Sequence, residues 1–391
     1  MKPHTLALLV CAMTLLAKTS LVAAEVPRHV DVYRVKGRFG GWPANHGIWS
    51  WGNEILVGFS AGYFKDNGPD RHAIDHDRAE EHLLARSLDG GETWTIENPA
   101  EHGALIPVGP ALHGVTPPGL KEKPWTDCPG GIDFTHPDFA LTARMTDAQS
   151  GPSRFYYSLD RGHRWMGPFR LPQFGQSGIA ARTDYIIDGR NTMMLFLTSA
   201  KSNRREGRPL CVRTTDGGKT WKFVAWIMPE AKGFGIMPST VRLGEKELLS
   251  TIRRREGRHR WIEAYRSLDD GASWQLDTVP AADLGEGNPP HLLRLADGRL
   301  CLTYGYRAKP FGIRARLSRD GGHTWQAELH LRDDGGGRDV GYVRSVQRPD
   351  GKIVTVYYFH DQPQSDRYIA ATIWDPDEDQ PRRQPASKKR T

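Results

Sequence analysis

The chain has 391 residues and a formal net charge of +7, and it contains 42 Gly and 27 Pro. This length allows a large hydrophobic core, and the frequent Gly and Pro favour short strands and turns over long helices. The positive charge favours an acidic ligand rather than nucleic acid, because basic and aromatic residues are not interleaved as in nucleic-acid-binding folds. No CxxC or HExxH motif is present, so we expect neither a metal nor another cofactor.

Both ends of the chain are predicted to lie outside the folded domain. Residues 1–24 carry Lys2, then an apolar run, then the small residues Val22, Ala23 and Ala24. This order is typical of a secretory signal peptide, and the apolar run is too short to span a bilayer. We therefore expect a secreted or periplasmic protein without a membrane span. The basic residues of the segment 376–391 predict a disordered tail.

A short motif, S/T-x-D-x-G-x-x-W, called the Asp box below, occurs five times at spacings typical of propeller blades. Its Asp can accept backbone N–H groups and close a turn, its Gly can take a positive φ, and its Trp can bury a large ring at the start of the next strand. Five copies in separate blades indicate turn clasps rather than catalytic acids or metal ligands. The motif ends at Trp94, Trp165, Trp221, Trp274 and Trp325, which we expect at the starts of the outermost strands.

The repeats predict an all-β fold, a six-bladed β-propeller with Asp-box turns over residues 25–375. The expected blades are 37–100, 101–170, 171–226, 227–279, 280–330 and 331–375, and the strand-like run 29–35 is expected to complete the last blade and close the ring.

One face of the disc is expected to carry the site. Aligning three strand–turn–strand segments places Arg255 and Arg307 at one position, with Arg253 or Arg254 as alternatives in the earlier blade. Because antiparallel strands reverse direction, Tyr342 and Glu286 lie on the same face as these arginines. The long loop 64–81, which contains Asp75 and Asp77, lies there too, and long loops on a rigid scaffold often bind ligands.

These features resemble the sialidase (neuraminidase) superfamily, and in particular bacterial secreted exo-sialidase-like proteins with Asp-box (BNR) repeats. The stretch GEGNPPHLLRLADGRLCLTYGYR looks like the blade that supplies a Glu and an Arg, and GYVRSVQRPDGKIVTVYY looks like the final blade, which opens on the nucleophilic Tyr. The resemblance implies that Tyr342 is the nucleophile, Glu286 its activating base and Arg307 a carboxylate ligand. It implies that Asp75 or Asp77 is the acid/base.

The sequence also departs from this family. The Arg-Ile-Pro motif of the first blade is replaced by GGWPANHGIW, which leaves Arg38 and Arg182 as candidates for the missing arginine. The second blade contains GGIDFTHPDFAL, whose His136 and Asp138 are expected near the active face. The predicted substrate-binding residues are therefore Arg307, Arg255, Arg182, Arg38, His136, Asp138 and His46.

The sequence thus predicts a glycosidase that cleaves a terminal acidic sugar, either sialic acid or another carboxylated sugar. It is expected to act as a monomer on an acidic glycan, without nucleic acid or cofactor. Two alternatives remain. One is a polysaccharide lyase, or another glycosidase, that uses His136 or His46 with Tyr342 and arginines. The other is a glycan-binding propeller without catalysis, which the missing first arginine favours.

Overall fold

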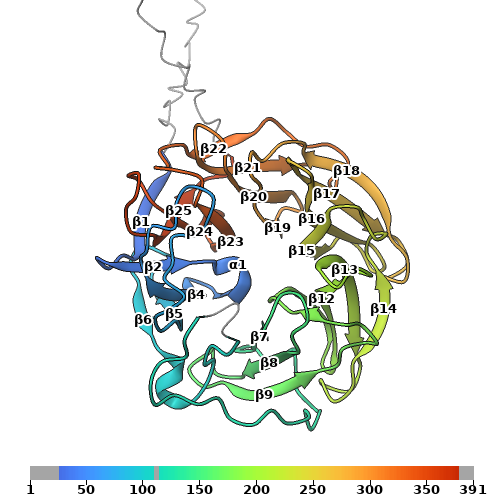
Figure 1. Cartoon of the computed structure of the whole chain (residues 1–391). Helices are drawn as coiled ribbons and strands as arrows, with labels where there is room; N and C mark the ends of the chain where they lie inside the picture. Colours follow the sequence, from blue (N-terminus) through green and yellow to red (C-terminus); the bar gives the residue numbers. More distant parts are fainter. Residues whose placement is uncertain (1–25, 110–113, 378–391) are drawn as a thin grey trace, which may run out of the picture.

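The structure is a computed structural model that describes residues 26–109 and 114–377, and it forms a six-bladed β-propeller (Figure 1). The predicted signal peptide and nearly all of the predicted tail lie outside these residues. No helix among the residues described is long and apolar enough to cross a membrane. The fold class predicted from the repeats is confirmed.

Blades 1 to 3 contain the strands between residues 38 and 226. Blade 1 contains β2 (Arg38–Gly41), α1 (Pro43–His46), β3 (Ile48–Trp51), β4 (Glu54–Tyr63), β5 (Glu81–Ser87) and β6 (Thr95–Glu97), and the short 3-10 helix η1 (Pro99–His102) follows it. Blade 2 contains β7 (Ala140–Met145), β8 (Ser153–Ser158) and β9 (Met166–Leu171). Blade 3 contains β10 (Ile179–Ala180), β11 (Tyr185–Gly189), β12 (Thr192–Ala200), β13 (Glu206–Thr214) and β14 (Lys222–Trp226).

The other three blades are regular four-stranded sheets. Blade 4 contains β15 (Phe234–Arg242), β16 (Leu248–Glu256), β17 (His259–Ser267) and β18 (Gln275–Ala281). Blade 5 contains β19 (Pro290–Arg294), β20 (Leu300–Tyr306), β21 (Gly312–Ser318) and β22 (Leu329–Arg332). Blade 6 contains β23 (Gly341–Gln347), β24 (Ile353–Phe359), β25 (Tyr368–Trp374) and β1 (Arg28–Tyr33).

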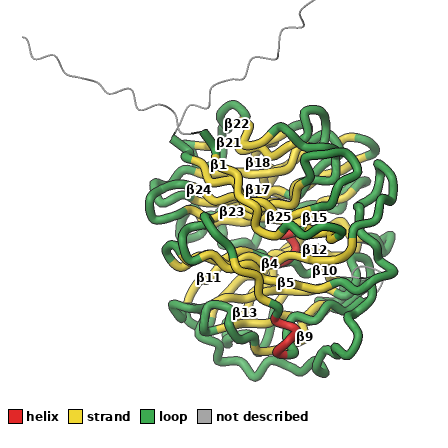
Figure 2. Tube along the Cα trace, turned by 90° about the vertical axis from the view of Figure 1, so that its left-hand side faces the viewer, coloured by secondary structure: helices red, strands yellow, loops and turns green. Residues whose placement is uncertain are grey.

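The ring closes where β1 pairs with β25 in antiparallel register, for example Asp31 with Ala370. The two described ends of the chain therefore lie in the same blade. This confirms the prediction that residues 29–35 complete the last sheet. Figure 2 shows the strands stacked through the depth of the disc, with loops at both of its faces. Because a strand from the N-terminal end completes the C-terminal blade, the first and last blades are joined and the ring is closed.

Blade 2 is irregular. Its three strands correspond to the second, third and fourth strands of the other blades, because its Asp box joins the last two, β8 and β9. The residues before β7 that are described, 104–109 and 114–139, contain no strand, and this stretch contains several prolines. Proline has no N–H to donate to a strand ladder, so it disfavours a paired inner strand here.

The Asp boxes form the predicted turn clasps. In the first box the Asp89 carboxylate accepts hydrogen bonds from the backbone N–H of Thr93 at 2.9 Å and from its hydroxyl at 2.6 Å. Ser87 Oγ accepts the Gly91 N–H at 2.7 Å. Partial burial raises the pKa of Asp89, but these hydrogen bonds lower it more, to about 2. Each motif Trp stands before the outermost strand of its blade, as predicted.

Replacing Asp216 with Ala should destabilise the fold without changing the site described below. In the third box its carboxylate accepts both the N–H of Thr220, at 2.9 Å, and its hydroxyl, at 2.6 Å. By analogy with lost helix caps the free energy of unfolding should fall by about 0.5–2 kcal/mol. Denaturant unfolding measures this, with the exposed Glu245→Ala as a control that removes a carboxylate without opening a clasp. Equal stability of the two variants would contradict the clasp.

Candidate active site

Three blades carry a left-handed non-glycine residue near their start, two of them within the first strand and one, Trp42, directly after β2. These residues are Trp42 (φ 59°), Met237 (φ 55°) and Tyr342 (φ 50°). The register of β15 against β16 shifts at Met237, and the register of β23 against β24 shifts at Tyr342. Met237 and Tyr342 pack in one apolar cluster with Ala44 of α1. Met237 and Tyr342 therefore occupy equivalent positions in their blades, each at a register shift of the first strand.

The backbone of Tyr342 is held in its strained conformation by Asn288. The Tyr342 N–H donates to Asn288 Oδ1 at 2.7 Å, and Asn288 Nδ2 donates to the carbonyl of Val340 at 2.9 Å. A Cβ on Gly341 would stand 2.4 Å from Asn288 Oδ1, so only glycine fits beside this amide. Left-handed non-glycine residues cost free energy and are concentrated at functional sites. Sequence analysis assigned no role to Asn288, although it closes the GEGN stretch.

Two arginines lie close to the side chain of Tyr342. Arg253 Nη1 donates to its hydroxyl at 3.2 Å, and the guanidinium of Arg307 lies 5.6 Å from the ring centroid. Burial alone would raise the pKa of Tyr342. The positive charges of Arg253, Arg307 and Arg182 lower it by more than burial raises it, so the pKa falls below its usual value. Arg307 and Arg182, two of the predicted substrate-binding residues, are therefore near enough for their charges to act on Tyr342. Arg182 itself pairs with Glu206 at 2.5 Å.

Arg253 and Arg307 lack a carboxylate partner within the described part of the chain. Arg307 donates through Nε to the carbonyl of Val340 at 3.0 Å and through Nη2 to the hydroxyl of Tyr358 at 2.5 Å. Arg253 has its hydrogen bond to Tyr342, and no ion pair joins either arginine to a described Asp or Glu. An anion placed beside Tyr342 would therefore meet two guanidinium groups that the protein has not neutralised.

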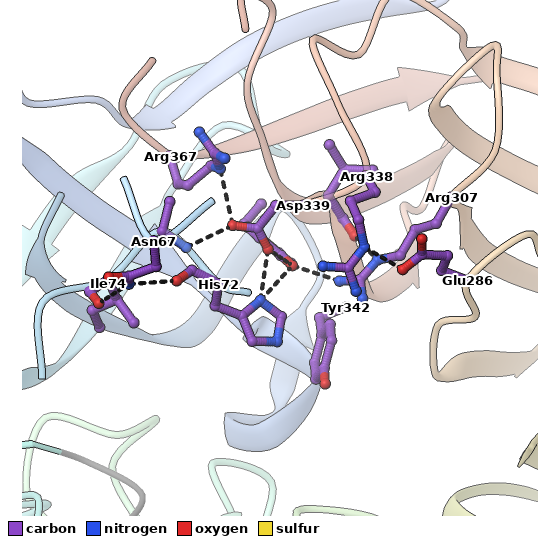
Figure 3. A network of polar contacts seen from close by, with 12 residues as sticks. Asn67, His72, Ile74, Glu286, Arg307, Arg338, Asp339, Tyr342 and Arg367 are labelled. Atoms are coloured by element: carbon purple, nitrogen blue, oxygen red, sulfur yellow. Dashed lines mark hydrogen bonds and ion pairs between the residues drawn. The ribbon is translucent and has the colours of Figure 1, made fainter. Parts of the chain in front are cut away.

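His72, which sequence analysis did not single out, lies on the other side of Tyr342 (Figure 3). Its Nδ1 is 2.6 Å from Asp339 Oδ1, and its ring centroid is 6.2 Å from that of Tyr342. Burial lowers the pKa of His72 by more than the nearby Asp339 raises it, so the ring is neutral near pH 7. A neutral ring that donates from Nδ1 to Asp339 carries its lone pair on Nε2. The only sequence signal for His72 was its place in the long loop 64–81.

Asp339 joins the long loop of blade 1 to blade 6. Besides His72 it accepts hydrogen bonds from Ala73 N at 3.0 Å, the Tyr358 hydroxyl at 2.7 Å and Arg367 Nε at 3.0 Å. Burial raises the pKa of this carboxyl, but His72 and the arginines lower it much more, so Asp339 stays ionised. The loop is also held by Asn67, whose amide donates to two of the loop's own carbonyls.

A cavity of about 460 Å³ opens beside His72. Its walls come from the blade 1 loop and from the segment before blade 6: Lys65, Asn67, Asp70, Arg71, His72, Ile74, His76, Asp77 and Arg338. Figure 3 shows the Tyr342 hydroxyl and the His72 ring directed to the same side, away from Asp339.

Two residues predicted beside Tyr342 lie elsewhere. Arg253, not Arg255, reaches Tyr342, because Arg253 pairs with Ile236 next to the bulge, whereas Arg255 lies two residues farther along β16 and is exposed at the rim. The expected contact between Glu286 and Tyr342 is not formed. The Glu286 carboxylate forms an ion pair with Arg338 and is half exposed.

The carboxylates of the long loop are engaged with a lysine. Lys65 Nζ lies 2.9 Å from Asp75 and 3.0 Å from Asp77. The hydrogen bond from Lys65 lowers the pKa of Asp75, which favours its ionised form. Asp75 is not among the residues that line the cavity beside His72. Its assignment as the acid stays a prediction.

The expectation that His136 and Asp138 lie near the active face is wrong. They precede β7. Because blade 2 lacks the first strand, β7 corresponds to the second strand of the other blades and begins at the face that carries the Asp boxes. There Asp138 Oδ1 accepts from Arg161 Nε at 2.6 Å, and Arg161 belongs to the second Asp box. An inner strand missing from blade 2 reverses the face on which this segment lies.

His46 and Arg38 also lie away from the Tyr342 hydroxyl. His46 is buried in α1, where Nε2 contacts Ser60 Oγ at 3.1 Å. Arg38 pairs with Glu81 at 2.6 Å and lies over the ring of Tyr63. Of the two candidates for the missing arginine, Arg182 is the one whose charge acts on Tyr342.

Comparison with known proteins decides the family. Residues 139–356 match the family described as BNR repeat-like domain. The chain belongs to this family. No curated protein sequence matches the chain significantly.

Solved structures share the fold of this BNR repeat-like protein. A Dyadobacter fermentans protein of unknown function has a TM-score of 0.67 and 21% identity, over 88% of this chain and 97% of its own. The NanB sialidase of Streptococcus pneumoniae has a TM-score of 0.58 and 11% identity, over 88% and 71%. The Trypanosoma rangeli sialidase has a TM-score of 0.54 and 12% identity, over 90% and 60%. These likenesses support the sialidase-like propeller fold that the sequence resemblance implied.

Replacing Arg253 with Met should raise the pKa of Tyr342, because it removes the largest of the charges that oppose burial. Tyrosinate absorbance is followed against pH, and the signal of the same protein with Tyr342→Phe is subtracted to isolate this one group. The parent midpoint should lie below the ordinary value of about 10, and Arg255→Met, two residues along the strand, should leave it in place. A parent midpoint above 10 would show that the arginines do not control this hydroxyl.

Proposed function

We propose that this protein is a glycoside hydrolase that removes a terminal carboxylated sugar, with Tyr342 as its nucleophile. The observation that carries the proposal is the pair Arg253 and Arg307, two guanidinium groups that lie beside Tyr342 and have no described carboxylate partner. Arginine binds carboxylates through paired, charge-assisted hydrogen bonds. A sugar carboxylate bound between them would bring the adjoining ring carbon to Tyr342.

The wider charge of this face supports an anionic substrate. Burial lowers the pKa of Arg260, and the neighbouring positive charges of Arg255 and Arg253 lower it further. A concave surface with an excess of one charge concentrates ligands of the opposite charge. The carboxylate that a sialic acid or uronic acid carries is such a ligand.

A tyrosine nucleophile suits a substrate whose reacting carbon stands next to a carboxylate. An anionic Asp or Glu would be repelled there, whereas a neutral hydroxyl would not, and glycosidases with a Tyr nucleophile are a known departure from the paired-carboxylate scheme. The lowered pKa of Tyr342 makes its oxygen easier to deprotonate during attack. A signal peptide over residues 1–24 would deliver the enzyme to glycans outside the cytoplasm.

A second candidate function is a lyase for uronic acid polysaccharides. It is favoured by the neutral His72 beside Tyr342, and by the lack of any described hydrogen bond between Tyr342 Oη and a carboxylate. In elimination, arginines neutralise the uronate carboxylate, one side chain removes the adjoining carbon-bound proton, and another protonates the leaving oxygen. The product then contains a new carbon–carbon double bond and no added water.

The test incubates the protein with sialosides and glucuronides and determines the product masses. Hydrolysis adds one water to the products, whereas elimination adds none and creates an ultraviolet-absorbing product. Tyr342→Phe should lower turnover by about 10³-fold or more, as removal of a nucleophile does elsewhere, while binding of the sugar persists. Unchanged turnover by Tyr342→Phe would refute the nucleophile. Binding of these sugars without any product would leave a glycan-binding propeller.

A further inference from the structure

His72 is fixed at one ring nitrogen and open at the other. Nδ1 is held by Asp339 at 2.6 Å, and the edge of the Trp42 ring, with centroids 5.3 Å apart, limits rotation of the imidazole. The side chain is one-third exposed and forms part of the wall of the 460 Å³ cavity. Nε2 therefore remains available to a substrate group that lies beside His72.

Asp339 is suited to support a positive charge on that ring. It is 3% exposed and accepts hydrogen bonds from His72, Ala73, Tyr358 and Arg367, so it cannot turn away. A buried carboxylate that accepts from one imidazole nitrogen fixes the tautomer and stabilises the imidazolium when the other nitrogen takes a proton. Asp339 and His72 have this arrangement, and the His72 ring lies 6.2 Å from the Tyr342 ring, centroid to centroid.

The carboxylates near this position are already engaged. Asp75 and Asp77 share the ammonium of Lys65, and Glu286 is paired with Arg338. No hydrogen bond in the described structure joins any of the three to Tyr342. The imidazole of His72 is therefore the group that can donate or accept a proton on the same side as the Tyr342 hydroxyl.

We propose that His72 is a catalytic residue that carries the proton from Tyr342 to the leaving oxygen of the glycoside, an assignment that rests on the hydrolase function proposed above. The phenolic proton passes to His72 Nε2, which leaves a tyrosinate beside Arg253 and an imidazolium held by Asp339. The tyrosinate oxygen then bonds to the anomeric carbon while the bond from that carbon to the leaving oxygen breaks. The imidazolium gives its proton to the leaving oxygen, and an alcohol departs into the cavity.

The second half of the reaction uses the same groups. Neutral His72 takes a proton from a water as the water oxygen bonds to the anomeric carbon. The bond from that carbon to Tyr342 breaks, and the tyrosinate regains its proton from His72. One water is consumed, one sugar and one alcohol are released, and no carboxylate has to change its protonation state. Asp339 acts as the positioning residue throughout.

The test compares leaving groups. His72→Ala and His72→Gln are assayed on methylumbelliferyl N-acetylneuraminide and sialyllactose, and on methylumbelliferyl glucuronide and a glucuronide disaccharide. Methylumbelliferone is acidic and leaves without a proton, whereas a sugar alcohol needs one. Both variants should lose activity on all four substrates, because His72 also takes protons from Tyr342 and from water. The loss should be at least about tenfold greater on the oligosaccharide than on the aryl glycoside of the same sugar, because only the oligosaccharide's leaving oxygen needs a proton. The Gln side chain can still donate to Asp339, so that variant keeps the loop contact.

The controls separate proton transfer from structure. Asp75→Asn and Asp77→Asn should keep the parent ratio of aryl to disaccharide rates, and Asp339→Asn should lower kcat on the disaccharide with little change in KM. Thermal unfolding shows that each variant is folded. Equal losses on both substrates, or full disaccharide activity of the His72 variants, would overturn the assignment alone. If the parent cleaves none of the four substrates, the proposed hydrolase function fails and this assignment fails with it.

Discussion

The buried carboxylate of Asp339 is the contact on which the site depends. It lies at the seam where the ring closes, and it binds the loop of blade 1 through His72 and Ala73 and binds blade 6 through Tyr358 and Arg367. Tyr358 in turn accepts a hydrogen bond from Arg307, so one hydrogen-bonded network links His72, the ionised Asp339 and the arginine beside Tyr342. Pairing of β1 with β25 holds the two sides of this seam together.

The fold was predictable because it is repeated. Each Asp box combines a hydroxyl, a carboxylate, a glycine and a tryptophan whose positions are set by local turn chemistry. The spacing of the five boxes marks five blades, and the chain after the last box is long enough for the sixth. The closing strand was also predictable, since residues 29–35 alternate as a strand with no partner nearby in sequence. The irregular blade 2 was not, because a missing strand leaves no motif. That omission sent His136 and Asp138 to the opposite face.

The site was predictable only where it follows the blade register. Tyr342 and Arg307 are set by strand ends, and both lie where the alignment placed them. Arg253 and Arg255 lie two residues apart on one strand. Choosing between them required the position of the register shift at Met237, which the sequence does not reveal. His72 depends on the path of an irregular loop and on a contact with Asp339, 267 residues away, which no local pattern encodes. The positions of side chains in loops could therefore be obtained only from the structure.

The central claim, that Arg253 and Arg307 receive a substrate carboxylate beside Tyr342, is tested most directly by calorimetric titration of the Tyr342→Phe variant. The ligands are N-acetylneuraminic acid and glucuronic acid, each compared with its own methyl ester. Loss of a charge-assisted hydrogen-bonded pair costs about 1.5–3 kcal/mol. The account predicts that at least one free acid binds roughly ten- to a hundredfold more tightly than its ester. Equal affinity of acid and ester for both sugars would contradict it.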